Sequence, residues 1–203
     1  AALAQQGWDV LLLERDHFPR HKVCGEFLSP EAQTTLRMLN LQGAVAAAAP
    51  VALTQATVTT RRGLTLRMAL PGAAWGVSRF VMDMALATAA QAQGVELWQG
   101  VTVKAFTKAA DYYAIQLQDR TQGQPRPTTV FARALIIACG RHSTTALPPH
   151  PAPHSRPLFV GMKAHYADLA MPAQVELYFF SGGYAGLNPV EGGRANLCLL
   201  LSY

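Results

Sequence analysis

The residues best suited to chemistry lie within the first 26 positions. Glu14 ends an apolar run at 10–13, and a basic loop then leads to Cys24, Gly25 and Glu26. Dinucleotide-binding folds place an acidic residue at the carboxyl end of a parallel strand, where it accepts hydrogen bonds from ribose hydroxyls. Glu14 alone leaves two interpretations open: a ribose-binding carboxylate, or a surface residue that merely ends a strand.

The elements that must position these residues are a helix and a strand. Residues 1–7 are typical of the last turns of a helix closed by a glycine cap. Residues 10–13 predict a parallel strand buried on both faces, because they are continuously apolar. The G-x-G-x-x-G fingerprint of such a unit belongs about 20 residues before the acidic residue, which is upstream of Ala1. Since the chain also ends inside an apolar run, we expect a fragment of a longer protein.

Composition narrows the class of protein. The chain has 203 residues, of which 50% are hydrophobic and 14% charged, so it can build a core of one or two domains. The net charge of +5 comes from scattered basic residues, which suits small anionic ligands such as phosphates better than nucleic acid. Three distant cysteines favour a reducing, cytoplasmic compartment. No metal-ligand set, membrane-spanning run or signal peptide is predicted.

The rest of the chain predicts two further helices and many short strands. One helix starts at Ser29 as the N-cap with Pro30 behind it, and another spans 79–93 with Gly94 as its cap. Residues 147–157 are rich in proline and predict a crossover between domains. Apolar alternation and flanking turn residues predict strands at 55–60, 64–70, 95–98, 101–106, 112–117, 130–131, 134–138, 159–166, 174–180, 184–188 and 195–201. The last four are expected to form an antiparallel region.

Several of these segments resemble one known family. Residues 13–15 and 19–30 are similar to the segment that follows the first βαβ unit in geranylgeranyl reductase-like FAD-dependent oxidoreductases. That group belongs to the glutathione-reductase-type flavoproteins, which include aromatic hydroxylases and flavin halogenases. Residues 79–83 look like its Arg-x-x-Phe-Asp helix start, residues 134–140 like its strand and turn, and residues 184–189 sit where the reductases carry Tyr-x-Trp-x-Phe-Pro.

The resemblance implies an α/β fold. It consists of an FAD/NAD(P)-binding Rossmann-like domain with an interleaved antiparallel β substrate domain. The first would comprise residues 1–50 and 76–147, without its glycine fingerprint. The second would comprise residues 51–75 and 148–203 and be incomplete.

The resemblance also implies a cofactor site and a substrate site. Glu14 would bind the adenosine ribose of FAD, Arg20 and Lys22 would stabilise phosphate charge, and Arg79 would reach the ribityl-pyrophosphate region. The full cofactor set is Glu14, Arg15, Arg20, Lys22, Cys24, Gly25, Arg79 and Gly140. The substrate set is Glu26, Tyr184, Gly186 and Pro189, and no residue is assigned as catalytic.

Without the family, these residues have simpler interpretations. Arg20 and Lys22 would be a solvated loop, Cys24 a small buried apolar residue, and Arg79 an exposed first-turn residue. Tyr184 and Pro189 would serve hairpin packing and turn chemistry.

Two departures from the family pattern bear on activity. Cys139 stands where the hydroxylases carry an Asp, which argues against their mode of NADPH use. Gly186 and Asn188 replace two aromatic residues of the reductases, which should widen the pocket and disfavour a long polyprenyl substrate.

Three functions follow as hypotheses. The first is an FAD-dependent oxidoreductase that acts on an apolar or polycyclic molecule, with NAD(P)H as a candidate electron donor. The second is a flavin monooxygenase or halogenase, and the third is a non-catalytic nucleotide-binding module. An apolar substrate would favour peripheral contact with a membrane, although the sequence shows no amphipathic anchor. The oligomeric state is left open.

Overall fold

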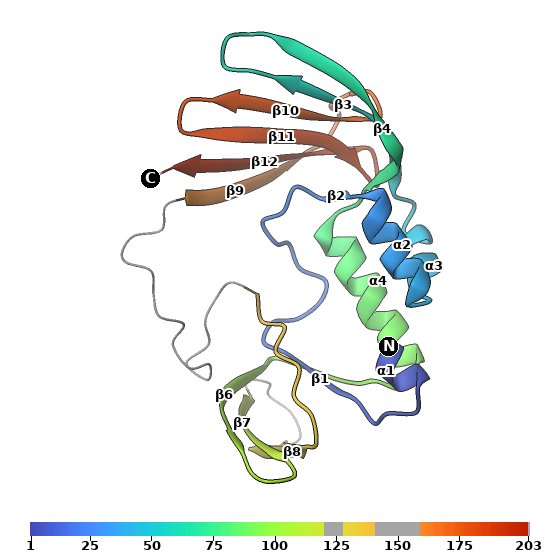
Figure 1. Cartoon of the computed structure of the whole chain (residues 1–203), viewed down its shortest axis with the longest axis vertical. Coiled ribbons are helices and arrows are strands. Elements are labelled where there is room, and N and C mark those ends of the chain that lie inside the picture. Colours follow the sequence, from blue (N-terminus) through green and yellow to red (C-terminus); the bar gives the residue numbers. More distant parts are fainter. Residues whose placement is uncertain (120–127, 141–158, 203) are drawn as a thin grey trace. The chain divides into compact units, whose positions relative to one another are not determined.

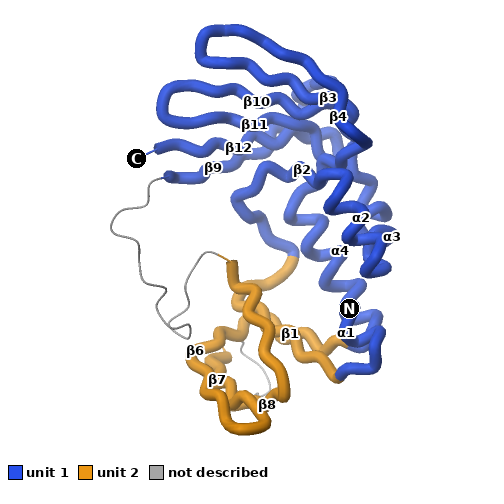
Figure 2. The backbone as a smooth tube through the Cα atoms, viewed as in Figure 1, with its two compact units in different colours: residues 1–8, 19–94, 156–203 blue, residues 9–18, 95–155 orange. Residues whose placement is uncertain are grey.

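The computed structural model describes residues 1–119, 128–140 and 159–202. The chain divides into two units (Figure 2). Unit 1 comprises residues 1–8, 19–94 and 156–203, and unit 2 comprises residues 9–18 and 95–155. Each unit therefore gathers segments that are distant in the sequence.

Unit 2 contains a parallel strand pair and a three-stranded antiparallel sheet. Its strands are β1 (Leu11–Glu14), β5 (Glu96–Gln99), β6 (Val101–Lys108), β7 (Tyr113–Asp119) and β8 (Thr129–Ala132). Strand β1 pairs in parallel with β5, and the antiparallel order is β6-β7-β8. The core forms around Val101, Ile115 and Leu117, against which Leu13 and Trp98 pack. The predicted parallel strand before Glu14 is confirmed.

The helices lie in unit 1. They are α1 (Ala2–Gln5), α2 (Pro30–Met38), α3 (Gln42–Ala46) and α4 (Arg79–Ala92). Ser29 caps α2, since its hydroxyl accepts a hydrogen bond from the Ala32 amide at 3.3 Å, and Ser78 caps α4 in the same way. Gly7 and Gly94 take positive φ angles of 81° and 86° just after helix ends, as the sequence predicted. Helices α2, α3 and α4 lie together (Figure 1).

Unit 1 is built on a seven-stranded sheet. Its strands are β2 (Phe27–Leu28), β3 (Val51–Thr59), β4 (Thr65–Gly76), β9 (Phe159–Tyr166), β10 (Gln174–Phe180), β11 (Gly183–Val190) and β12 (Arg194–Ser202). Their order across the sheet is β2-β4-β3-β10-β11-β12-β9 (Figure 1). The predicted hairpin of β3 and β4 is confirmed, and all four strands predicted after residue 158 belong to the same sheet.

The four strands after residue 158 pair antiparallel, as expected, but the expectation that the whole β region is antiparallel was wrong. Strand β10 pairs in parallel with β3, with Val175 opposite Ala56. Two antiparallel groups, one on either side of this pairing, are thereby joined into one sheet. The sequence pattern carries no signal for this, because strand direction depends on how the intervening chain returns. The proline-rich crossover predicted at 147–157 lies outside the described residues.

Two expectations about buried strands were wrong. Residues 134–138 form no strand, and Ile136 and Ile137 are 73% and 48% exposed. No strand of the described chain pairs with this run, although Leu135 packs against the core of unit 2. Strand β1 is a strand but is not covered on both faces, since Leu12 is 41% exposed and β5 is its one partner among the described strands.

Candidate functional site

Glu26 is the centre of the most connected polar cluster in unit 1. Its backbone is left-handed, with φ at 53°, although glycine is the residue that adopts this conformation without strain. The Glu26 amide donates to the Cys24 sulfur at 3.4 Å, and its carbonyl accepts from the Val77 amide at 3.1 Å and the Asn188 side chain at 3.4 Å. These bonds hold the strained conformation. The neighbouring Gly25 has no positive φ and is exposed.

The carboxylate of Glu26 is buried and has three donors from two other segments. It accepts from the Arg79 amide at 2.7 Å and from the ammonium of Lys163, and His165 Nε2 lies 2.6 Å from Oε2. The Lys163 side chain is 6% exposed and that of Glu26 is inaccessible. A buried carboxylate is tolerable only with such compensation. The cluster therefore ties the loop before β2 to the start of α4 and to β9.

A second carboxylate also binds the start of α4. Glu191 accepts from the Ser78 amide at 2.7 Å and from the Ser78 hydroxyl at 2.5 Å. The same hydroxyl accepts from the Val81 amide at 3.2 Å. Glu26 and Glu191 thus satisfy amides that a helix start leaves without an internal partner, where negative charge is also favoured by the helix dipole.

Arg79 and Lys22 converge on Asp83. The Arg79 guanidinium donates to both carboxylate oxygens, at 2.7 and 2.9 Å, and Lys22 lies 2.7 Å from one of them. Burial raises the pKa of the Asp83 carboxyl, but the hydrogen bonds from Arg79 and Lys22 outweigh it and leave the pKa below its ordinary value. The hydrogen bond to Asp83 in turn raises the pKa of Arg79 above its ordinary value. Lys22 and Arg79, two of the predicted cofactor residues, are thus both bound to the Asp83 carboxylate.

His21 lies beside this cluster. Its ring stacks on Phe80 with centroids 4.8 Å apart and meets the ring of His165 edge-on at 5.2 Å. Burial lowers the pKa of His21, and the nearby Lys163 and His165 lower it further. His21 is therefore expected to be neutral at pH 7.

Cys24 and Cys198 belong to the same neighbourhood. The Cys24 carbonyl accepts from the Asn196 side chain at 3.2 Å, and Cys198 lies two residues further along β12. Burial raises the pKa of the Cys198 thiol, and the charge of Cys24 raises it further. Both cysteines are free thiols.

The remaining predicted cofactor residues are placed as follows. Arg20 is half-buried in the loop of unit 1. In unit 2, Glu14 ends β1 and accepts a hydrogen bond from the Asp16 amide at 3.0 Å, while Arg15 is exposed and forms an ion pair with Asp16. Gly140 is exposed, with φ at 73° and open space where a Cβ would be.

Apart from Glu26, the predicted substrate residues lie on β11, on opposite faces of the sheet. Residues opposite one another in neighbouring strands share a face, which puts Tyr184 and Gly186 on the side of Cys198, and therefore on the side of Lys163. Pro189 points to the other side by alternation, and its carbonyl lies where a Cβ of Gly76 would be. Tyr184 is exposed and its ring lies 5.7 Å from that of Phe179.

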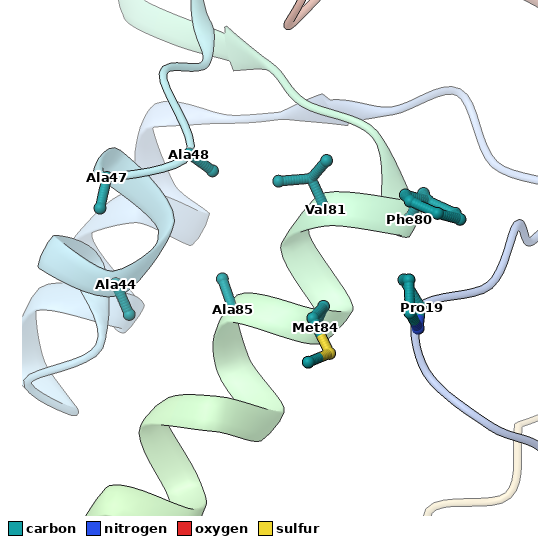
Figure 3. A pocket seen from close by; sticks show the side chains of 8 residues that line it. All are labelled: Pro19, Ala44, Ala47, Ala48, Phe80, Val81, Met84 and Ala85. Carbon is teal, nitrogen blue, oxygen red and sulfur yellow. The ribbon is translucent and has the colours of Figure 1, made fainter.

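A pocket of about 340 Å³ opens between α3, α4 and the loop that precedes β2 (Figure 3). Its lining is apolar and consists of Pro19, Ala44, Ala47, Ala48, Phe80, Val81, Met84 and Ala85. No side chain there can donate, accept or move a proton. The pocket can hold apolar atoms, whereas the polar chemistry of unit 1 belongs to the Glu26 cluster.

Several residues of the cluster escaped prediction from sequence. Lys163 and His165 alternate on a strand and so share a face, but nothing in the sequence indicates which carboxylate they meet. Asp83 was part of a recognised motif without a role, although its i, i+4 spacing from Arg79 is typical of a helical ion pair. Asn188 was noted only as a departure from the reductase motif, and Asn196 gave no signal beyond being a polar residue within an apolar strand.

Among the helices of the described residues, none has the length and apolar composition needed to cross a lipid bilayer. No protein-family model matches the chain. The conditioned medium factor receptor 1 of Dictyostelium discoideum is 27% identical over 161 residues, covering 71% of this chain and 31% of that protein.

Solved structures are similar over nearly the whole chain. A flavoprotein/dehydrogenase from Cytophaga hutchinsonii has a TM-score of 0.77 and 18% identity, covering 99% of this chain and 52% of its own. The flavin-dependent halogenase CmlS has a TM-score of 0.75 and 19% identity, covering 99% and 38%. The myxobacterial chondrochloren halogenase CndH, a variant of the FAD-dependent halogenases, has a TM-score of 0.73 and 20% identity, covering 98% and 48%.

The chain thus spans about half the length, or less, of these solved structures and about a third of the curated relative. At these identities, the likeness establishes architecture. The chain has the α/β fold of FAD-binding flavoproteins, as its sequence predicted.

Proposed function

We propose that this chain is part of an FAD-dependent oxidoreductase that acts on an apolar small molecule. The observation that carries the proposal is the likeness of 98–99% of the chain to flavoproteins, two of them flavin-dependent halogenases. Glu14 at the carboxyl end of a parallel strand supports it, because this is where such folds bind ribose. The three free thiols fit a reducing, cytoplasmic setting.

The residues present fit FAD by their chemistry. Glu14 offers a carboxylate for ribose hydroxyls, and Arg20, Lys22 and Arg79 offer cations for the diphosphate. A guanidinium has five N–H groups, and Asp83 accepts from two of those of Arg79. When bound, FAD supplies the redox chemistry. The protein residues would bind it, orient it and shape the space for the substrate, with residues 51–75 and 148–203 as the substrate-facing region.

Two reaction types remain as candidates. The geranylgeranyl reductase-like form rests on the motif at residues 19–30. A halogenase or monooxygenase is favoured by the similar structures of CmlS and CndH. Both forms need an electron donor, for which we propose NAD(P)H.

The first test is the visible absorption spectrum of the longest native chain that contains this segment, purified without added cofactor. Flavin bands that survive desalting are expected. A colourless protein that also fails to take up added FAD would contradict the proposal. Bleaching of the bands by NADH or NADPH under nitrogen tests the donor. Oxygen uptake that depends on substrate then separates an oxygen-using enzyme from a reductase.

A further inference from the structure

His165 has the arrangement of an oriented base. Its Nε2 lies 2.6 Å from the Glu26 carboxylate, and its side chain is 12% exposed. A carboxylate that accepts from the Nε2 proton leaves the lone pair of the ring on Nδ1. No hydrogen bond to Nδ1 is observed within the described part of the chain. One ring nitrogen is thus fixed and the other remains available to a ligand.

The charges around His165 suit proton transfer to it. His165 contacts Glu26 and His21 directly, and the cluster around these two also contains Cys24, Arg79, Lys163, Arg194 and Cys198, from the loop, α4, β9 and β12. The Lys163 ammonium would stabilise an anion that forms near His165. Lys163 and His165 contact the same Glu26 carboxylate, so the site places a positive charge close to the base.

Exposed aromatic side chains lie two rows away from His165 on the same face of the sheet. The register places His165 beside Asn196, then Lys163 beside Cys198 in the next row, and Leu200 beside Tyr184 and Phe179 in the row after it. The row of Leu200 lies four residues along the strand from the row of His165, which is roughly 14 Å at about 3.4 Å per residue. Phe179 and Tyr184 are exposed. An apolar molecule of that length could lie on them with a polar group at His165.

We infer that His165 is a general base toward the hydroxyl group of an apolar phenol or enol. The inference deepens the proposed function and rests on it. In this step the O–H bond of the substrate breaks, its proton moves to Nδ1 of His165, and the electron pair stays on oxygen. Glu26 stabilises the resulting imidazolium, and the charge of Lys163 stabilises the phenolate or enolate.

The test uses 4-nitrophenol, whose ionisation is visible by absorbance, with the flavin-containing full-length protein. Bound probe is expected to ionise about one pH unit below free probe, a tenfold change in its acid constant. The variant H165Q should lose most of this shift while it keeps its flavin bands. The control H17Q changes an exposed histidine of unit 2 and should keep the shift.

A second measurement needs no substitution. In wild-type protein labelled with ¹⁵N-histidine, saturation with the probe should convert one imidazole to imidazolium at a pH where the free protein has it neutral. An unchanged shift in H165Q, no new imidazolium signal, or no binding of 4-nitrophenol to flavin-loaded protein would each overturn the inference and leave the proposed function standing. A native chain that takes up no flavin would instead contradict the proposed function.

Discussion

Two of the segments that resemble flavoprotein motifs have opposite surroundings. In residues 22–28, Glu26 is 2% exposed, and its backbone and carboxylate bond to α4, β9 and β11. Residues 134–140 form no strand, and their two isoleucines are largely exposed. Both segments were identified by their resemblance to family motifs. The first is held by hydrogen bonds from several elements, whereas the second contacts the core of its unit through Leu135.

The difference shows what each kind of pattern requires. A polar motif such as Lys22 to Glu26 needs partners of specific geometry, and unit 1 supplies them. An apolar run needs a covering layer on each face. Within the described chain, the core of unit 2 contacts Leu135, whereas Ile136 and Ile137 stay exposed. Substitutions in residues 22–26 are therefore expected to destabilise the protein far more than substitutions in residues 134–138.

The substitution E26Q should have the largest effect. It removes the charge that compensates Lys163 and His165 in a buried site, and breaking such a pair costs about 3–5 kcal/mol. Urea unfolding of the flavin-free protein measures it. R15Q, at an exposed ion pair, is the control and should leave the midpoint unchanged. Equal midpoints for E26Q and wild type would remove the contrast between the two segments.

The substitution G76A should cost about 3 kcal/mol or more. A Cβ at Gly76 would lie 1.9 Å from the Pro189 carbonyl oxygen, and this backbone pairs with Phe27 directly after the motif. The matched control is G43A, because a Cβ there meets open space in α3 and alanine favours helix. Thermal unfolding should therefore show opposite signs for the two variants, and a shared sign would argue against this close contact.

The substitution D83N should cost about 2 kcal/mol at neutral pH, since the ion pairs with Arg79 and Lys22 are lost. The folded-state pKa of Asp83 is depressed, so the unfolded chain binds more protons. The stabilisation is complete above the ordinary carboxyl pKa of 3.8 and disappears as pH falls below it. Unfolding measured from pH 7 to 3 should show wild type and D83N converging at the acid end; a constant gap would refute the ionised pairing.

The substitution I136S should change stability by less than about 0.5 kcal/mol, as expected of an exposed side chain. I115S, in the core of unit 2, provides the contrast and should be strongly destabilising. A large loss for I136S in the native protein would show that this run is covered there, and would restore the buried strand that its sequence predicted.

Local signals predicted much of the fold. The caps Ser29 and Gly94 were recognised because capping depends on residues within one helical turn. The β3–β4 hairpin was recognised from alternation around Arg62 and Gly63. By contrast, the parallel pairing of β10 with β3 joins segments that are distant in the chain, and no local pattern encodes it.

The candidate site was predicted only in part, because local motifs indicate single residues but not their partners on distant strands. Cys24, Glu26 and Arg79 were singled out through their motifs, and the structure brings them together in unit 1. Lys163 and His165 were not, because a strand residue reveals the face it points to but not its partner across space. The left-handed conformation of Glu26 was also missed, since Gly25 beside it is the residue that normally signals such a backbone.

The parallel β3–β10 pairing has a consequence for the order of folding. The β3–β4 hairpin and the β10–β11–β12 meander each join neighbours in sequence, so they can form on the microsecond scale of hairpins. Joining them requires closure of a long loop before any hydrogen bond between β3 and β10 forms. We expect this step to limit the folding rate, so that substitutions at the β3–β10 boundary slow refolding, whereas those within either hairpin mainly accelerate unfolding.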